Sequence, residues 1–270
     1  MTVAFVLPGG ASLGACQVGM LEALHEAGVA ADILIGSSAG AINAAYLGLH
    51  PGAEGLAGMA RLWTSFRRRD LIRIRPAQVT LGLLGRRQAI FDRSGMERML
   101  ARELGAARLE DMDVPVIVVA ADVISGEAVT LRAGPALGAV LASSAMPGIF
   151  APVPWRGRWL VDGSVAADAP VAQAQDLGAD VVYVLSTTVR PPRPPRGALD
   201  LAVHAFTLVT GTATAAQLER ARERGTVHVL PPPVVDDPGV FDFSRAPALI
   251  AESRRNTMAW LDRAPGTHVA

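Results

Sequence analysis

The first 49 residues alternate twice between a short apolar run and a helical pattern, and this order constrains the fold more than any other feature. Residues 3–7 and 32–35 are short, largely apolar runs, whereas residues 14–27 and 39–49 have helical patterns. Strands separated by a helix pair in parallel, because a long crossover must return the chain to the same edge of the sheet. Parallel sheets are covered by helices on both faces. The sequence therefore predicts an α/β fold with a mostly parallel central sheet between two helical layers.

The later elements continue this alternation along a chain that we expect to form one domain over residues 1–270. Residues 116–121 are continuously apolar, as a central strand buried on both faces should be. Residues 52–104 are expected to form a helical excursion and a candidate lid, and residues 191–196 form a stiff proline and arginine connector within the domain. Further strands are predicted at residues 114–123, 128–131, 149–152, 159–161, 181–185 and 227–230, and helices at residues 135–143, 168–177, 199–224 and 245–261.

The charge balance and the single cysteine narrow the classes of partner and cofactor. All 25 basic residues are arginine and are balanced by 25 acidic residues, so the formal net charge is zero. This balance argues against a protein that binds nucleic acid by neutralising phosphates. Cys16 alone forms neither an internal disulfide nor a metal cluster, and it falls on a predicted helix as a small core residue. We therefore expect no metal, no cofactor and a reducing compartment, the cytoplasm.

No segment is expected to direct secretion or to cross a membrane. The first apolar run has no basic flank and stops at Pro8. The longest apolar candidate, residues 199–216, contains an aspartate, a histidine and four threonines, and it falls short of the roughly 20 apolar residues of a spanning helix. The arginine-rich segment from Arg61 to Arg93 also contains apolar residues. It is either a solvated helical excursion or a flap that makes peripheral contact with the inner membrane surface.

A serine lies on the predicted turn between the second strand and the second helix. Residues 36–40 fit the pattern G-x-S-x-G, with Ser38 as the serine and Gly36 and Gly40 as the flanking glycines. On such a turn the serine has strained dihedral angles that expose its hydroxyl, and the glycines leave room for a substrate. A helix N-terminus also favours negative charge beside it. Ser38 is therefore a candidate nucleophile, and the alternative is a helix N-cap.

The order of residues along the chain does not fit an ordinary Ser–His–acid triad. In α/β-hydrolases several strands precede the serine, and a late histidine completes the triad. Here only one strand and one helix precede the strand that leads to Ser38. The late histidines are His204, His228 and His268. His228 lies inside an apolar strand and His268 lies near the end of the chain, so neither is expected to be catalytic.

A glycine-rich loop, residues 8–14, joins the first strand to the first helix. Backbone N–H groups at such a turn suit an anion. Reading from Gly9, a dinucleotide fingerprint would need glycine where Ala11 stands, although Gly14 fits and Asp32 stands at a tolerable distance. An oxyanion hole needs only two N–H donors aimed at one point. Both sites remain open on these residues, and the oxyanion hole also explains why the serine turn follows the next strand.

Three motifs in this order resemble those of the bacterial patatin-like phospholipases. After the glycine loop and the serine turn comes the dipeptide Asp162-Gly163, which follows a predicted strand. Residues 142–150, residues 168–171 and, near the C-terminus, residues 241–244 are also similar to segments of that family. The resemblance covers nearly the whole chain, and the combination is specific although each motif alone is not.

The resemblance implies a patatin-like three-layer fold and a Ser–Asp pair in place of a triad. Ser38 would attack an ester carbonyl, Asp162 would take its proton, and the backbone N–H groups of Gly9, Gly10 and Ala11 would hold the oxyanion. The implied substrate is a lipid or another acyl ester, and neither metal nor cofactor is required. We expect burial to raise the pKa of Asp162 toward the working pH. By itself, Asp162 reads as a turn residue before glycine.

Departures from the family pattern affect the expected specificity more than the expected chemistry. The family's loop commonly has a third glycine and a basic residue where this chain has Ala11 and Leu13, so a preference for phospholipid head groups is less supported. Ser164 stands where glycine or alanine is common. The main prediction is a serine acyl hydrolase of the phospholipase A or lysophospholipase type. The alternatives are acyl transfer or thioester cleavage by the same serine, a lipid-binding protein without turnover, and a nucleotide-binding α/β protein.

Overall fold

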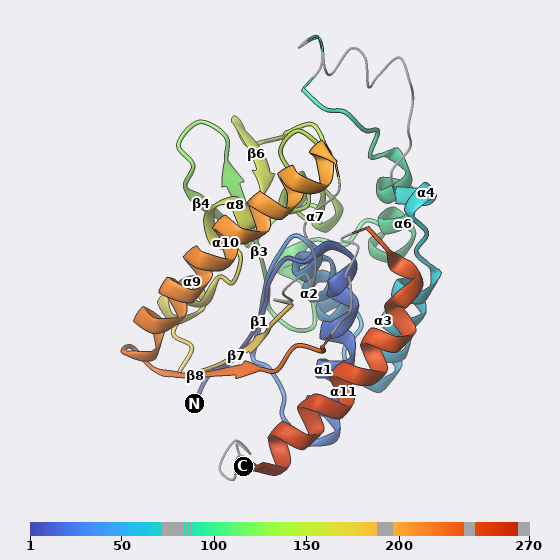
Figure 1. Ribbon diagram of the computed structural model, residues 1–270. Helices are drawn as coiled ribbons and strands as arrows, with labels where there is room; N and C mark the ends of the chain where they lie inside the picture. The colour runs from blue at the N-terminus through green and yellow to red at the C-terminus, as the bar shows by residue number, and fades with distance from the viewer. Residues whose placement is uncertain (72–83, 85, 87, 188–196, 235–240, 264–270) are drawn as a thin grey trace.

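A central sheet with helices on both sides makes up the part of the chain that the computed structural model describes, residues 1–71, 84, 86, 88–187, 197–234 and 241–263 (Figure 1). The strands are β1 (Val3–Leu7), β2 (Ile33–Ser37), β3 (Val116–Asp122), β4 (Ala128–Leu131), β5 (Val153–Trp155), β6 (Arg158–Asp162), β7 (Val181–Leu185) and β8 (Thr226–Leu230). Their order is β5-β6-β3-β2-β1-β7-β8, with β4 also paired to β3. Strands β3, β2, β1, β7 and β8 are parallel, whereas β4, β5 and β6 pair antiparallel. The predicted α/β fold with a mostly parallel sheet is confirmed.

The central strands are buried on both faces, which explains their continuously apolar sequences. Within β1, Val3, Phe5 and Leu7 belong to the larger hydrophobic core, whereas Ala4 and Val6 belong to a smaller core on the opposite face. Alternate side chains of a strand point to opposite faces, so both sets must be apolar when helices cover both faces. The strand β3 alternates between the two cores in the same way.

The helices form one layer on each face of the sheet (Figure 1). Those that contribute to the larger core are α1 (Gly14–Glu26), α2 (Ala39–Leu49), α3 (Gly52–Ser65), α6 (Ser94–Leu104), α7 (Ala136–Ser143) and α11 (Ala246–Arg263). Those that cover the smaller core are α8 (Ser164–Ala167), α9 (Val171–Asp176) and α10 (Ala198–Arg222). The short elements are α4 (Arg68–Leu71) and the 3₁₀ helices Ala11–Leu13, Leu109–Asp111 and Phe243–Arg245. Gly19 lets α1 and α11 approach closely, since a Cβ there would overlap the Ile250 carbonyl.

Two predicted elements differ from those observed. The strand expected at residues 149–152 begins later, as β5, because the carbonyls of Gly148 and Ile149 accept hydrogen bonds from the segment at residues 90–91 instead of joining the sheet. The helix expected over residues 168–177 begins later, as α9, and α8 ends before residue 168. Pro170 disfavours a helical conformation at Ala169, and it stands directly before the first residue of α9, so the helix starts after it.

The long helix α10 has an unusually exposed apolar face. By length and composition, Leu201–Arg222 is the one helix of the described residues that could cross a membrane, and only 11% of its most apolar stretch is buried. Its inner side packs on α9, α8 and β8. Length and composition alone do not place this helix in a bilayer. Because the outer face of α10 is exposed, core packing does not explain its apolar residues.

Candidate active site

The residues of the G-x-S-x-G pattern form a tight turn in which Ser38 alone joins β2 to α2. Ser38 has a φ of 52° and a ψ of −121°, a conformation that a residue other than glycine rarely adopts. The backbone is also crowded here. A Cβ on Gly36 would overlap the carbonyl of Gly40, and a Cβ on Gly40 would overlap the last carbonyl of β1. Both glycines are therefore required by the close approach of other backbone segments.

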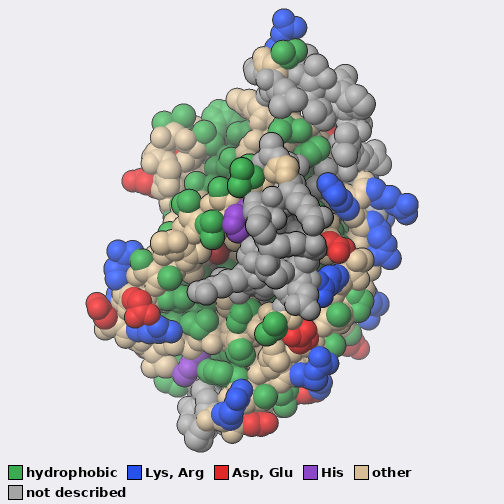
Figure 2. Space-filling view, viewed as in Figure 1, with side chains coloured by type: hydrophobic (Ala, Val, Ile, Leu, Met, Phe, Trp, Pro, Cys, Tyr) green, Lys and Arg blue, Asp and Glu red, His purple; other side chains and the backbone are tan. Residues whose placement is uncertain are grey.

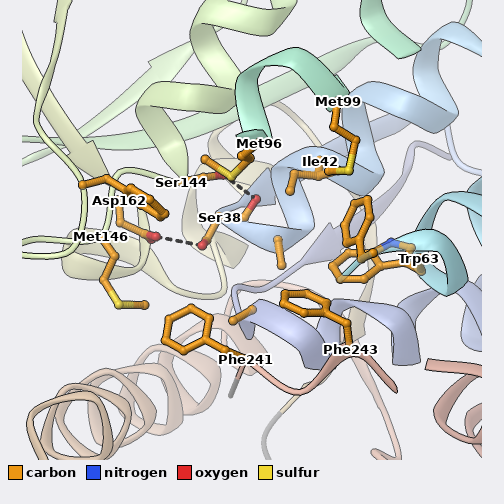
Figure 3. Close-up of a pocket in the computed structure, with 14 residues that line it drawn as sticks. Ser38, Ile42, Trp63, Met96, Met99, Ser144, Met146, Asp162, Phe241 and Phe243 are labelled. Carbon is orange, nitrogen blue, oxygen red and sulfur yellow. Dashed lines mark hydrogen bonds between the residues drawn. The ribbon is translucent and has the colours of Figure 1, made fainter. Parts of the chain in front are cut away.

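The carboxyl of Asp162 reaches Ser38 because a single strand, β3, lies between β2 and β6. The strand β2 ends just before Ser38, and β6 ends at Asp162. In the register of the sheet, Ser37 pairs with Val119, and Asp162 pairs with Ala120 on the other side of β3. Asp162 Oδ2 accepts a hydrogen bond of 2.7 Å from Ser38 Oγ (Figure 3). The fold thus brings together the two residues that the sequence singled out as nucleophile and base.

Burial controls the acidity of Asp162, which is only 1% exposed. Its Oδ1 accepts the N–H of Ser164 over 2.9 Å, while its Oδ2 faces Ser38. Burial raises the pKa of Asp162 from its usual 3.8 to about 6, although hydrogen bonds from Ser164 and Ser38 favour the ionised form, and the charge of Asp168 adds to the rise. Such a carboxyl is ionised at neutral pH and is a stronger base than an exposed aspartate, so it can accept a hydroxyl proton.

Two further serines hold the backbone of Ser38 in place. Ser143 Oγ accepts the N–H of Ser38 over 2.9 Å and donates to the carbonyl of Val119 over 2.5 Å. Ser144 Oγ donates to the carbonyl of Ser38 over 3.4 Å. These bonds fix the strained turn against β3 and the end of α7, which keeps the Ser38 hydroxyl directed at the carboxyl.

The glycine loop contacts the serine through Gly9, whose two peptide groups are both bonded. A Cβ on Gly9 would lie 3.3 Å from Ser38 Cβ. The carbonyl of Gly9 accepts a hydrogen bond from Thr187 Oγ1, and its N–H donates to the carboxyl of Asp168. Burial raises the pKa of Asp168, and hydrogen bonds from Ser164 and Gly9 oppose the rise.

The next two residues of the loop, Gly10 and Ala11, have unusual backbone angles. Gly10 has a φ of 154°, and its carbonyl accepts the N–H of Leu13 over 2.9 Å. Ala11 has a φ of 47°, in the left-handed region where a residue with a Cβ costs about 1 kcal/mol. Ala11 and Ser38 line the same cavity. The structure therefore accommodates alanine at this loop position in a conformation that favours glycine.

A buried polar network connects the loop to the helices behind it. Gln17 Nε2 donates to the carbonyl of Pro8 over 2.8 Å, and Asn43 Nδ2 donates to Gln17 Oε1 over 2.8 Å and to the carbonyl of Gly14 over 2.9 Å. Asn43 Oδ1 accepts a hydrogen bond of 2.6 Å from Trp63 Nε1. Each partner is buried and bonded, so the network holds both ends of the loop against α2 and α3.

An apolar cavity of about 590 Å³, including its open mouth, begins at Ser38 and Asp162 (Figure 3). Among the described residues that line it, Asp162 is the only charged one. The rings of Trp63 and Phe66 have centroids 5.0 Å apart, and Phe243 lies 6.3 Å from Trp63 and 5.7 Å from Phe66. The other apolar residues of the lining are Ala11, Ala39, Ile42, Met96, Met99, Met146, Phe150 and Phe241. The lining has the apolar character of a site for an apolar chain.

The other candidate residues from the sequence that the structure describes lie away from Ser38 or are buried in the core. Asp32 Oδ2 accepts the backbone N–H of Val3 at the start of β1 over 2.7 Å, so this carboxylate has a structural role. The rings of His228 and Tyr183 have centroids 4.9 Å apart in a tilted arrangement, and burial lowers the pKa of His228. Cys16 is fully buried, which raises its pKa to about 12, and His268 lies outside the described residues. No group of three metal-ligating side chains occurs in the described part of the chain.

Several residues of the site were not identified from the sequence. Ser143 and Asp168 lie in segments that carried the family resemblance, so the polar residues of those segments were a usable signal. The sequence around Thr187 carried no such signal, because Thr187 and Gly9 are 178 positions apart along the chain. The aromatic wall also joins distant segments, since Phe243 stacks on Trp63.

An α/β sheet with a serine on a strand-to-helix turn and a carboxyl within its reach is an architecture of acyl hydrolases. The chain belongs to the patatin-like phospholipase family, whose family model matches residues 5–174. The matched residues include the glycine loop, the serine turn and Asp162. The family places this domain among the lipid acyl hydrolases.

Relatives by sequence are similar in the same region. An uncharacterized NTE family protein of Mycobacterium tuberculosis is 29% identical over 197 residues, which cover 73% of this chain and 52% of the relative. The human patatin-like phospholipase domain-containing protein 6 is 28% identical over 186 residues, which cover 68% of this chain and 13% of that protein. The chain thus spans about half the length of the mycobacterial relative and a small part of the human one.

Solved structures of two bacterial proteins are also similar over 97% of this chain. VipD from Legionella pneumophila has a TM-score of 0.49 at 14% sequence identity, with 67% of its chain covered. The type III effector protein ExoU has a TM-score of 0.46 at 18% identity, with 53% covered.

Proposed function

We propose that this chain is a serine acyl hydrolase that cleaves carboxylic esters of lipids, with Ser38 as nucleophile and Asp162 as its base. The observation that carries this proposal is the hydrogen bond of 2.7 Å from Ser38 Oγ to the buried Asp162 carboxyl. A serine hydroxyl is a weak nucleophile unless a base removes its proton, and Asp162 is the base within reach. The family to which the chain belongs is consistent with this chemistry.

The proposed reaction proceeds through an acyl-enzyme. Ser38 Oγ attacks the ester carbonyl carbon while its proton passes to Asp162 Oδ2. The tetrahedral intermediate then expels the alcohol, which takes that proton from Asp162. Water attacks the acyl-Ser38 ester, again with Asp162 as the base, and releases the carboxylic acid and the free serine. The pKa of about 6 leaves Asp162 ionised at neutral pH, ready for both proton transfers.

We assign the oxyanion donors to the backbone N–H groups of Gly10 and Ala11. The sequence suggested Gly9 as a third donor, but its N–H is engaged by Asp168. In this assignment Gly9 anchors the loop, and the two residues after it face the carbonyl oxygen. The contact between the loop and Ser38, together with the place of Ala11 in the cavity wall, supports it.

The apolar cavity supports an acyl chain as the group that binds next to Ser38. An acyl chain fills such a cavity by burying its methylene groups, each worth about 0.8 kcal/mol. The described lining contains no cationic side chain. The cavity therefore fits the acyl part of a substrate but offers no group that would bind an anionic head group.

Peripheral contact with a lipid surface is a second part of the proposal. Within the segment from Arg61 to Arg93, for which this contact was one of two interpretations, residues 72–83, 85 and 87 lie outside the described residues. In the described part, α10 has no charged residue from Leu201 to Leu218. Its exposed, uncharged residues on one face are Leu201, Ala205, Leu208, Val209, Thr212 and Ala216. Figure 2 shows hydrophobic side chains along this helix, and we assign the lipid contact to this face.

The test combines a fluorophosphonate probe with hydrolysis of p-nitrophenyl esters. The wild type should label and turn over, Ser38→Ala should lose both, and Asp162→Ala should lose turnover. Ser37→Ala is the matched control, because Ser37 is the neighbouring serine and its hydroxyl bonds the carbonyl of Ala167 at 2.7 Å. It should label and turn over like the wild type.

The products and the vesicles separate the remaining alternatives. Release of free acid in the presence of glycerol indicates hydrolysis, whereas acyl-glycerol indicates a transferase. Binding of the wild type to vesicles without labelling or turnover would indicate a lipid-binding protein and would refute the hydrolase proposal. Replacing Leu208 and Val209 by glutamate should reduce sedimentation with phosphatidylcholine vesicles and leave hydrolysis of a soluble ester unchanged.

A further inference from the structure

Asp168 lies under the glycine loop, where its carboxyl has no role in the reaction described above. A Cβ on Gly9 would lie 2.8 Å from Asp168 Oδ1 and would overlap Ser164 Oγ, so the carboxyl and the hydroxyl both lie close to Gly9. The N–H of Gly9 and the hydroxyl of Ser164 donate to the Asp168 carboxyl. Asp162 and Asp168 are neighbouring carboxyls, and the negative charge of Asp168 acts on Asp162. Among the described residues, no cation compensates the charge of these two carboxyls.

The opposite side of the same loop residue is held by Thr187. This residue is 5% exposed, and its Oγ1 donates to the carbonyl of Gly9. The loop packs tightly here, since a Cβ on Gly10 would lie 2.8 Å from both Cβ and Oγ1 of Thr187. Asp168 and Thr187 therefore fix the N–H and the carbonyl of one glycine from two separate elements.

This double anchor determines the direction of the next N–H group. In a trans peptide the carbonyl and the following N–H point in opposite directions. When Thr187 holds the Gly9 carbonyl, the Gly10 N–H must point away from Thr187. A glycine loop is conformationally free, with Gly10 at a φ of 154°, so without the anchors this direction would not be fixed.

We propose that Asp168 and Thr187 are positioning residues that fix the Gly9 peptide so that the N–H groups of Gly10 and Ala11 point at the oxyanion formed on Ser38. This inference rests on the proposed function and names residues that neither touch the substrate nor transfer its proton. Ser164 bonds the carboxyls of both Asp162 and Asp168, so it links the loop anchor to the base. One hydroxyl has a single proton, so it donates to one carboxyl at a time.

The test measures kcat and KM for a p-nitrophenyl ester in the full chain. Asp168→Ala removes the acceptor of the Gly9 N–H, and Thr187→Val removes the donor to its carbonyl at nearly constant volume. Each should lower kcat about 10- to 100-fold, since a misplaced oxyanion donor costs on that order, and should change KM less than about threefold. Asp168→Asn keeps an acceptor oxygen and should restore kcat to within about fivefold of the wild type. Asp176→Asn, an exposed carboxyl on α9 paired with Arg224, is the control and should match the wild type.

The outcomes distinguish this inference from the proposed function. An active wild type whose Asp168→Ala and Thr187→Val variants keep full kcat would overturn the inference and leave the hydrolase proposal standing. The inference also fails if Asp168→Asn loses as much kcat as Asp168→Ala, because the acceptor oxygen would then not be what matters. If Asp168→Ala does not fold, Thr187→Val and Asp168→Asn decide the question by the same criteria. A wild type that neither labels nor turns over overturns both proposals.

Discussion

Asp162→Asn is expected to make the protein more stable at pH 8 while abolishing its activity. The ionised carboxyl is buried, and burial raises its pKa from 3.8 to about 6. Asparagine has nearly the same shape, keeps an acceptor for the N–H of Ser164 and carries no charge to desolvate. It cannot take a proton from Ser38, so stability and activity should change in opposite directions.

The magnitude follows from the difference in pKa between the folded and unfolded states. Because the folded-state pKa is raised, the folded protein binds the proton more tightly than the unfolded chain does. The stability from this proton is fully present below pH 3.8 and is lost as the pH rises through 6. About two pKa units at about 1.4 kcal/mol each give a cost of about 3 kcal/mol at pH 8, and about half of that at pH 5.

Urea unfolding of the wild type and Asp162→Asn at pH 5 and pH 8 measures this cost. The variant's advantage over the wild type in free energy of unfolding should be larger at pH 8 than at pH 5 by about 1–2 kcal/mol, since other titrating groups cancel in the comparison. Asp176→Asn breaks an exposed ion pair and should change stability by less than about 1 kcal/mol at both values of pH. A difference for Asp162→Asn that is the same at pH 5 and pH 8 would refute the view that desolvation of its charge sets the pKa.

The remaining predictions concern the base, the loop and the cavity wall. The value of kcat/KM for a soluble ester should fall about tenfold per pH unit below about pH 6, as the base becomes protonated; a limb near pH 4 would show that burial does not raise the pKa of Asp162. Ala11→Gly should keep activity and raise the free energy of unfolding by up to about 1 kcal/mol, because Ala11 has a φ of 47°; a loss of stability in urea unfolding would contradict this. Trp63→Phe should lower the free energy of unfolding by about 1–3 kcal/mol, because Asn43 Oδ1 loses its buried donor; an unchanged urea midpoint would contradict it.

Sequence periodicity was sufficient for most of the fold. A strand buried on both faces must be apolar throughout, so β1, β3 and β7 are visible as continuous apolar runs. The helix α2 was predicted with its observed bounds, because the G-x-S-x-G pattern marks the turn at its start. The prediction was wrong for the strand at residues 149–152, where a loop pairing overrides the local pattern, and for the start of the helix at residues 168–177, which begins after Pro170.

The candidate site could be predicted only in part. Ser38 was identified by a local pattern, since a strand, a tight glycine turn and a helix are adjacent in the sequence. Asp162 was identified by resemblance, because the dipeptide Asp-Gly by itself is equally a turn. The contact of 2.7 Å between them depends on both strands flanking β3, and the antiparallel direction of β6 is not encoded in its own residues.

The sequence by itself determined the layers of the fold, the strained turn of Ser38 and the residues that could act as nucleophile and base. The tertiary structure alone decided which groups surround them: the anchors of Gly9, the serines behind Ser38 and the aromatic wall that joins α3 to residues 241–243. The physical reason is the distance along the chain over which each kind of interaction acts. Periodicity and turn chemistry act over a few residues, whereas hydrogen bonding across the fold and the burial that raises the pKa of Asp162 exist only once distant segments have packed together.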